Sequence, residues 1–268
     1  MIESIQDNSI KNEVTVILNG YKRGECLNEQ YESLKSQSFA PSKICLWYNH
    51  PEQGEVNYDI IEKIPTALSN VNLGVWARFA YALTANTEYI CVFDDDMIPG
   101  KKWLENCVNT IKNVNGLLGA VGLKYVNPNP PNHSCYYEEY QRFGWIPGGQ
   151  SEVPIEVDLV GHVWFFKREW LSYYWRELPD PKYFTCGEDM HFSYMLQKYA
   201  GIKTFVAPHP LSDLEKWGNV GGSRYATDKN SMWETNQASP QGVPFKHLMN
   251  DAFVVQRKKG WKLINERV

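Results

Sequence analysis

Strand-like and helix-like segments alternate along the first half of this chain, and that alternation limits the fold more than any other feature. The strand-like segments are short apolar runs, and the helix-like segments repeat apolar residues every three or four positions. This order predicts an α/β fold, with a largely parallel central sheet and helices on both of its faces. The expected strands are 13–19, 43–49, 88–93 and 117–126, and the expected helices are 24–38, 74–86 and 101–114.

The second half of the chain continues the pattern less regularly. Residues 127–156 are rich in Pro, Gly and Asn, which predicts a long loop or short hairpins. With 268 residues and 43% hydrophobic content, the chain fits one large domain. We expect strands at 157–167 and 203–210, helices at 168–178, 187–201 and 243–258, and an irregular segment at 211–242.

Charge and cysteine content narrow the class of protein. A formal net charge of -4 gives no overall attraction to nucleic acid or to an anionic membrane. The chain has no basic and apolar leader and no apolar run of about 18 residues, so we expect no targeting or transmembrane segment. The absence of a CxxC pair favours reduced thiols and a cytoplasmic protein, whether free, peripheral at a membrane or part of a longer polypeptide. The six cysteines are Cys26, Cys45, Cys91, Cys107, Cys135 and Cys186.

Three consecutive aspartates, Asp94, Asp95 and Asp96, directly follow the apolar segment 88–93. Two carboxylates about 4 Å apart repel each other by about 4 kcal/mol at an effective dielectric constant near 20, so this strand end needs positive charge. Mn²⁺ or Mg²⁺ would supply that charge, because both ions accept oxygen ligands. Alternation along the strand would place Asp94 and Asp96 on one side and Asp95 on the other. The alternative is that the aspartates only cap the following turn.

The chain resembles the GT-A type nucleotide-sugar glycosyltransferases, with similarity to family 2 and exostosin-like enzymes. The motifs that carry the resemblance follow the order of the family between about residues 13 and 210. They are VTVILNGYKRG (14–24), NLGVWARFAYAL (72–83), VFDDDMIPG (92–100), VDLVGHVWFFKREWL (157–171) and CGEDMHFSYML (186–196).

The resemblance implies a GT-A, Rossmann-like domain and a metal-dependent sugar transfer. The donor would be a nucleotide sugar, with UDP preferred, and the acceptor a hydroxyl group of a glycan. A nucleotide-binding half would cover 13–126 and a smaller acceptor-side half 127–210, followed by a flexible loop and a C-terminal helix at 211–268. Residues after 210 carry no motif of the family. The oligomeric state, the sugar, and inversion or retention stay open.

The resemblance also implies roles for residues at the carboxyl edge of the sheet. Asp96 would bind the metal directly, Asp94 would lie at the ribose or the metal, and His209 would be a further metal ligand. A solvated turn is the alternative for Lys22 and Arg23, an exposed helix arginine for Arg78, and a structural histidine for His209. The implied nucleotide-binding residues are Asn19, Gly20, Tyr21, Arg23, Arg78, Asp94 and Asp95.

Glu188 and Asp189 are the implied catalytic pair. Asp189 would be the general base of an inverting enzyme, or would hold the acceptor or face the anomeric carbon in a retaining one. The alternative is that both are favourable first residues of a helix, because the helix dipole stabilises anions there. Gly161, His162 and Trp164 are the implied residues of the sugar and acceptor pocket.

Two other features have open interpretations. Trp145 is either an acceptor platform or, as we prefer, an anchor for the long loop. Segment 211–236 is either a linker or a lid that closes over the nucleotide and brings Arg224 or Lys229 to the diphosphate.

Two other functions compete with sugar transfer. A nucleotidyltransferase acting on sugar phosphates would also hold Mg²⁺ on carboxylates, but its first loop is typically rich in glycine, and NGYKRGE has only two separated glycines. A non-catalytic glycan-binding module with a transferase fold is the third possibility, and the intact DDD and ED motifs disfavour it.

Overall fold

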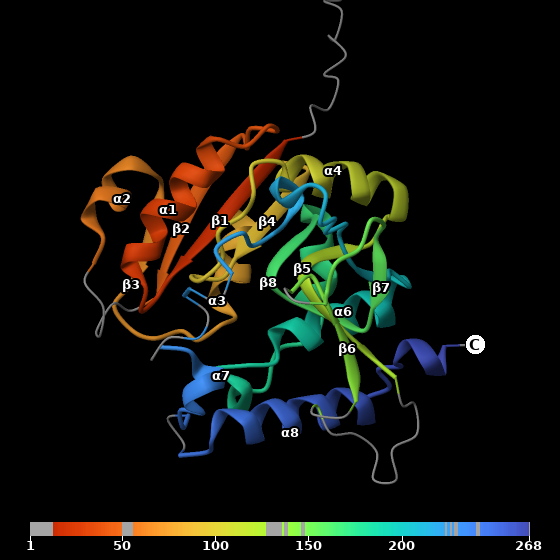
Figure 1. The fold of residues 1–268 in the computed structure, drawn as a ribbon. Coiled ribbons are helices and arrows are strands. Elements are labelled where there is room, and N and C mark those ends of the chain that lie inside the picture. Colours follow the sequence, from red (N-terminus) through yellow and green to blue (C-terminus); the bar gives the residue numbers. More distant parts are fainter. Residues whose placement is uncertain are drawn as a thin grey trace, which may run out of the picture.

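The computed structural model has one nine-stranded sheet at its centre (Figure 1). The strand order is β3-β2-β1-β4-β8-β5-β9-β7, and β6 pairs with β5. The structure describes residues 13–49, 56–126, 136, 139–145, 148–222, 224, 225, 227, 230–239 and 242–267. The strands are β1 (Val14–Gly20), β2 (Lys43–Asn49), β3 (Thr66–Ser69), β4 (Tyr89–Phe93), β5 (Leu117–Tyr125), β6 (Tyr140–Phe143), β7 (Ile155–Val157), β8 (Leu159–Lys167) and β9 (Thr204–Val206).

Most of these strands run in the same direction. The pairings orient β1, β2, β3, β4, β5 and β9 one way and β6, β7 and β8 the other way. Strands β3, β2, β1 and β4 pair in parallel, whereas β8 lies antiparallel between β4 and β5. The predicted α/β fold with a mostly parallel sheet is confirmed.

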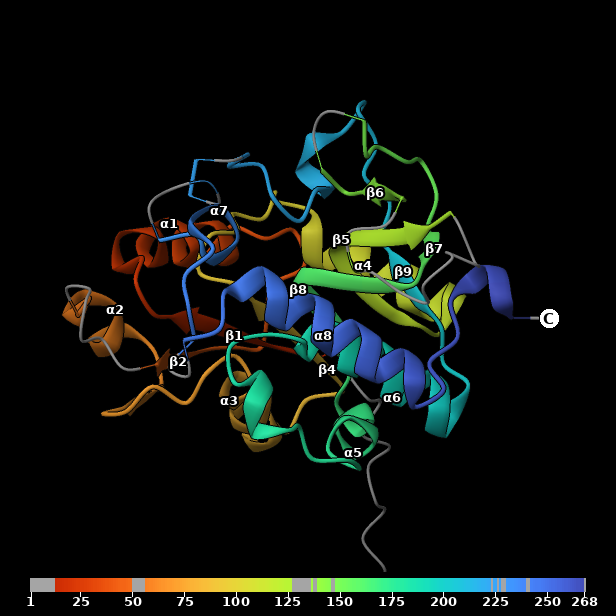
Figure 2. The ribbon, with the colours of Figure 1, turned by 90° about the horizontal axis from the view of Figure 1, so that it is seen from below.

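Helices cover both faces of the sheet, and Figures 1 and 2 show α1 and α4 on one face and α3, α5 and α6 on the other. Helices α7 and α8 lie beyond the edge at which β1 ends (Figure 1). The helices are α1 (Gly24–Lys35), α2 (Tyr58–Lys63), α3 (Ala77–Tyr81), α4 (Trp103–Val114), α5 (Leu171–Tyr174), α6 (Glu188–Ala200), α7 (Met232–Thr235) and α8 (Phe245–Lys258).

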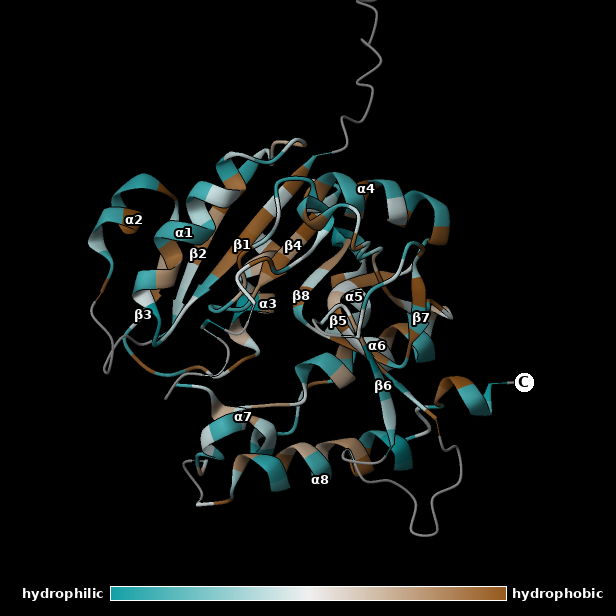
Figure 3. Ribbon diagram, viewed as in Figure 1, coloured by the Kyte–Doolittle hydropathy of each residue, from teal (hydrophilic) through white to brown (hydrophobic). Residues whose placement is uncertain are grey.

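The hydrophobic pattern explains this layering. In Figure 3, β1 and β4 are mostly hydrophobic and the outward surface of α4 is hydrophilic. Helix α4 buries Trp103, Leu104, Cys107, Val108 and Ile111, which recur every three or four residues, as expected for a helix with one apolar face.

Two glycines set the ends of α6. Gly187 precedes the helix with φ 88°, and Gly201 follows it with φ 63°. Both angles lie in the left-handed region, which costs glycine little because it has no Cβ. The first turn of α6 therefore begins at Glu188 and Asp189, at the same edge of the sheet as the aspartates after β4.

The structure differs from the predicted elements mainly where helices are short. The predicted helix 74–86 is reduced to α3 and a 3-10 turn at Ala82–Thr84, and the predicted helix 168–178 to a 3-10 turn and α5. Helix α2 and strand β3 were not predicted, because each spans six residues or fewer and shows little periodicity. The described residues of segment 127–156 include β6, and β7 begins at the end of the segment, at Ile155.

The C-terminal region packs on a second hydrophobic core. Helices α6 and α8 contribute Met190, Met195, Leu248 and Phe253 to this core, and Trp261 closes it. None of the described helices is both long and apolar enough to cross a lipid bilayer. The described cysteines are all free and buried, and Cys135 lies outside the described residues.

Candidate active site

A cavity of about 320 Å³ lies at the carboxyl ends of β1 and β4. Residues after these two strands line it, together with β8, the first turn of α6, and residues from segments 136–145 and 227–249. Most of the predicted site residues are brought together here. They are Asn19, Tyr21, Arg23, Arg78, Asp94, Asp95, Asp96, Gly161, His162, Trp164, Glu188 and Asp189.

Two buried arginines neutralise part of the acidic cluster. Arg23 Nη1 lies 2.7 Å from Asp95 Oδ1 and 3.8 Å from Asp96 Oδ2. Arg23 is 5% exposed, so the solvated turn predicted as its alternative does not form. A guanidinium group in this position balances the charge that the strand end acquires from consecutive aspartates.

Arg78 connects the aspartates to the first turn of α6. It forms ion pairs with Asp94 and, at 2.7 Å, with Glu188 Oε1. Its guanidinium also lies 4.7 Å from the centre of the Trp164 ring, a cation–π contact. Arg78 is 3% exposed, which rules out an exposed helix arginine.

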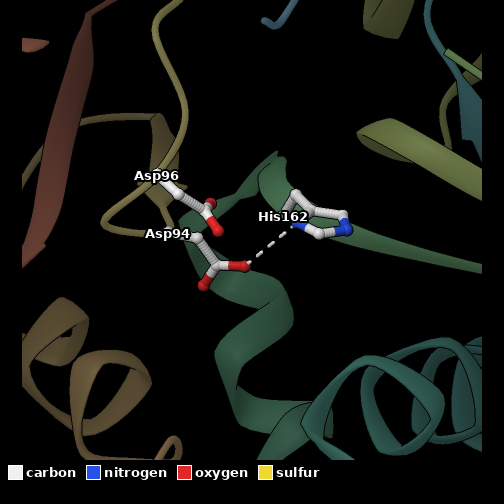
Figure 4. A group of neighbouring side chains, drawn as sticks. All are labelled: Asp94, Asp96 and His162. Atoms are coloured by element: carbon white, nitrogen blue, oxygen red, sulfur yellow. Dashed lines mark ion pairs between the residues drawn. The ribbon is translucent and has the colours of Figure 1, made fainter. Parts of the chain in front are cut away.

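Asp94, Asp96 and His162 form a group that fits a divalent metal ion (Figure 4). Each residue offers one ligand atom, and these atoms lie within 4.8 Å of one another. Within the described part of the chain, Asp96 Oδ1 and His162 Nδ1 are buried without a hydrogen-bond partner. An ion bound here would give both atoms a partner. A set of two carboxylates and one imidazole suits Mn²⁺ better than Mg²⁺, which prefers oxygen alone.

The backbone holds His162 in an uncommon conformation. Its φ angle is 67°, in the left-handed region that residues other than glycine rarely occupy. Its carbonyl oxygen accepts a hydrogen bond of 2.8 Å from the backbone N–H of Asp94. This bond joins the first half of β8 to the start of the acidic run, and such local strain is typical of functional sites.

Burial raises the pKa of four carboxylates at this site, among them Asp95, although it pairs with Arg23. Burial, followed by the charges of Asp94 and Asp95, raises the pKa of Asp96 to about 8. Burial also raises the pKa of Glu188 to about 8 and that of Asp189 to about 6, although Arg78 opposes the shift at Glu188. The pKa of His162 is lowered by burial, which keeps its imidazole neutral and able to bind a metal ion.

Gly20 and His209 are the predicted site residues that the structure places elsewhere. Gly20 packs in the core, where an added Cβ would lie 3.3 Å from Leu27. His209 is 0% exposed, its Nδ1 is 2.7 Å from the carbonyl oxygen of Ala207, and its Nε2 accepts a bond of 3.3 Å from the N–H of Gly218. Both ring nitrogens of His209 have partners within the core, and the group that could hold a metal ion contains His162 instead.

The different surroundings of His162 and His209 lead to different predictions for their replacement. His162→Asn is expected to weaken Mn²⁺ binding by tenfold or more, because asparagine tolerates a positive φ but does not replace the imidazole. His209→Ala is expected to leave Mn²⁺ affinity unchanged and to lower the free energy of unfolding by about 1–3 kcal/mol, because it leaves buried polar groups without partners. Calorimetric Mn²⁺ titration and urea unfolding of both variants test this, and a loss of Mn²⁺ affinity in His209→Ala would reverse the assignment.

The remaining predictions have mixed outcomes. Trp145 is partly buried against the main core and also lines the cavity, a position that fits both of its interpretations. Lys22 lines the cavity and donates to Gln237 at 3.1 Å. Arg224 is exposed and pairs with Glu29. Lys229 lies outside the described residues.

Sequence reasoning missed one wall of the cavity. Neither the spacing of the residues in this wall nor a motif connects them to the acidic run. The lining residues that were missed include Tyr136, Tyr140, Arg142, Trp233, Phe245 and Met249.

Comparison with known proteins gave similarity to solved structures alone. No family model matches the chain, and no curated protein matches it. Similar structures include S. aureus TarS residues 1–349 in complex with UDP-GlcNAc, at 16% identity over 76% of this chain and 60% of that one, with a TM-score of 0.49. The same fragment in complex with UDP is 15% identical, over 73% of this chain and 60% of that one, with a TM-score of 0.47. A longer TarS chain is 16% identical, over 73% of this chain and 36% of that one, with a TM-score of 0.47. The chain therefore spans between 36% and 60% of the length of these three structures.

Proposed function

We propose that this chain is a metal-dependent GT-A glycosyltransferase, which transfers a sugar from a nucleotide sugar to a hydroxyl group of a glycan. The observation that carries the proposal is the group formed by Asp94, Asp96 and His162, whose ligand atoms lie within 4.8 Å of one another in the wall of a cavity. UDP is the preferred nucleotide, on the family resemblance of the sequence.

The donor would bind on the β1 side of the cavity. Asn19, near the end of β1, and Tyr21, directly after that strand, line the cavity there, with Arg23 beside them. Mn²⁺ in the metal group would neutralise negative charge on the leaving nucleoside diphosphate. Arg23 and Arg78 would add positive potential at the same place, where charge develops as the sugar–phosphate bond breaks.

Asp189 is assigned as the general base. Its Oδ1 accepts a hydrogen bond of 2.7 Å from the backbone N–H of Met190. On its other side lies Gly161, where an added Cβ would be 3.8 Å from Asp189 Oδ2, so the glycine leaves room for an acceptor. With a pKa of about 6, this carboxylate is ionised at neutral pH and can accept the proton of the attacking hydroxyl group.

Glu188 is assigned a positioning role. Its carboxylate accepts from Arg78 and so orients the guanidinium between α6 and the aspartates. Because Glu188 reaches the other groups through Arg78, its replacement should change donor affinity more than the proton transfer.

Slow hydrolysis of nucleotide sugars without an acceptor tests the proposal. The protein is incubated with a panel of UDP-, GDP- and CDP-sugars, with Mn²⁺ or with EDTA, and release of the nucleoside diphosphate is measured. We expect release from one donor class with Mn²⁺ and at least tenfold less with EDTA. Thermal shift with each nucleoside diphosphate and Mn²⁺ is measured in parallel.

The same experiment separates the competing functions. If a nucleoside diphosphate stabilises the protein but no donor is hydrolysed with or without glycans, the chain is a binding module. Formation of a nucleotide sugar from a sugar phosphate and a nucleoside triphosphate would identify a nucleotidyltransferase. If no nucleotide binds in the presence of Mn²⁺, the transferase proposal is wrong.

A further inference from the structure

The cavity has two walls of different chemistry. One wall carries the aspartates, Glu188, Asp189 and the arginines that pair with them. The other wall is aromatic and comes from parts of the chain that are distant in sequence. Its rings are Tyr136, Tyr140, Trp145, Trp233 and Phe245.

The aromatic wall begins next to the metal group. The centre of the Trp145 ring is 5.8 Å from that of His162. Farther along, Tyr136 and Trp233 meet edge to face, with their ring centres 6.1 Å apart. Aromatic rings of this kind offer flat apolar surface to ligands, and their arrangement places that surface beside the reacting centre.

One arginine on this wall differs from the others that line the cavity. Arg23 and Arg78 are both paired with carboxylates, whereas no ion pair or hydrogen-bond acceptor for Arg142 is found among the described residues. Its guanidinium lies 5.4 Å from the centre of the Trp145 ring. A cation–π contact of this kind leaves the guanidinium N–H groups available to an anion.

The position of Arg142 favours the acceptor over the donor. Arg142 lies on β6, and the order β1-β4-β8-β5-β6 separates it from the nucleotide loop after β1 by four strand spacings of about 4.8 Å, or about 19 Å. His162, on β8, lies between them. Arg142 is therefore on the side of the metal group away from the loop after β1, where the nucleotide is proposed to bind. Glu234 also lines the aromatic wall, but no ion pair joins it to Arg142 in the described chain.

We propose that Arg142, in cation–π contact with Trp145, binds an anionic group of the acceptor glycan, a carboxylate or a phosphate on the sugar that carries or adjoins the attacked hydroxyl group. This inference rests on the proposed transferase function. It makes Arg142 the specificity determinant for an acidic acceptor, with the rings of Trp145 and Trp233 contacting the apolar faces of its sugars.

Matched disaccharides test this inference through binding. Disaccharides based on glucose, galactose and N-acetylglucosamine are prepared in a neutral form, with a carboxylate at C6, and with a phosphate at C6. Their affinities are measured by calorimetry at 150 mM salt, with and without UDP and Mn²⁺. At least one acidic form is expected to bind tenfold or more tightly than its neutral counterpart, and the stronger of the two acids identifies the source of the anion.

Arg142→Gln is expected to abolish the preference for the acidic form and to leave UDP affinity within twofold of the original. Arg176→Gln is the matched control, because Arg176 is an exposed arginine that stacks on Tyr199 at 4.9 Å outside the cavity. The control should keep the preference.

Equal binding of neutral and acidic forms, or no binding of any form, would overturn the inference. A loss of UDP affinity in Arg142→Gln would assign the residue to the donor instead. Failure of UDP itself to bind to the original protein would count against the proposed function, and the disaccharide titrations without nucleotide would still report on Arg142.

Discussion

Replacement of Asp96 by asparagine is expected to weaken Mn²⁺ binding at least 100-fold and to lower kcat for donor hydrolysis by about 1,000-fold. Asp96 contributes a buried carboxylate oxygen with no hydrogen-bond partner in the described structure, in the group that fits the ion. A neutral amide oxygen is a weaker ligand and leaves the metal charge uncompensated. Without the ion, the leaving diphosphate loses its main stabilisation.

The same replacement should stabilise the metal-free protein. The pKa of Asp96 is about 8 in the folded protein, against an ordinary value of 3.8. Between these values the folded state binds more protons than the unfolded state, so this group lowers the free energy of unfolding as pH rises from about 4 to about 8. The asparagine side chain cannot ionise, and the contribution of this position to the pH dependence disappears. Activity and metal-free stability should therefore change in opposite directions.

Urea unfolding in EDTA at pH 5 and pH 8, together with Mn²⁺ calorimetry, measures both effects. Asp95→Asn is the control from the same strand end, because Asp95 pairs with Arg23 and is not part of the metal group. This control should still bind one Mn²⁺. If Asp96→Asn binds Mn²⁺ as well as the original protein does, the metal assignment is wrong.

The first half of the fold could be predicted because the hydrophobic pattern of each segment agrees with the place of that segment in the sheet or on its faces. Strands such as β2 and β4 are continuous apolar runs, and α4 has a clear apolar face, so their ends were predicted within a few residues. The helix predicted at 74–86 is longer than α3, because the chain forms a 3-10 turn at Ala82–Thr84. The spacing of the apolar residues does not reveal this turn.

The acidic side of the site could be predicted because it is local in sequence. Consecutive aspartates after a strand need positive charge nearby to offset their repulsion. The alternation of side chains along a strand predicts that Asp94 and Asp96 lie together. The structure brings these two into one group and directs Asp95 to Arg23.

The partners of the acidic group are long-range and could not be predicted from spacing. His162 reaches the aspartates because β8 lies antiparallel next to β4 and because its backbone adopts a positive φ. His209 was the more obvious candidate by family resemblance, but it is 0% exposed and lies between the rings of Trp103 and Trp217. The aromatic wall likewise depends on how α7 and α8 fold back over the edge of the sheet (Figure 2). No sequence motif predicts this arrangement.

Replacement of Asp189 by asparagine is expected to lower kcat for transfer to an acceptor by about 1,000-fold, with little change in donor binding. General base catalysis typically contributes between about 100-fold and 10,000-fold. The asparagine side chain has the same size and can still accept from the N–H of Met190, but it cannot take the proton of the attacking hydroxyl group. Because Asp189 is not part of the metal group, affinities for Mn²⁺ and the nucleoside diphosphate should stay within twofold.

The pH profile distinguishes a base from a residue that only holds the acceptor. Transfer by the original protein should fall on the acid side of about pH 6, the pKa of Asp189, and the residual transfer by Asp189→Asn should lack that decline. Asp59→Asn, on the exposed surface of α2, is the control and should retain full activity. If Asp189→Asn keeps more than a tenth of the original kcat, a group other than Asp189 accepts the proton of the attacking hydroxyl group. If its rate falls but the decline near pH 6 persists, Asp189 orients the acceptor and a different group takes the proton.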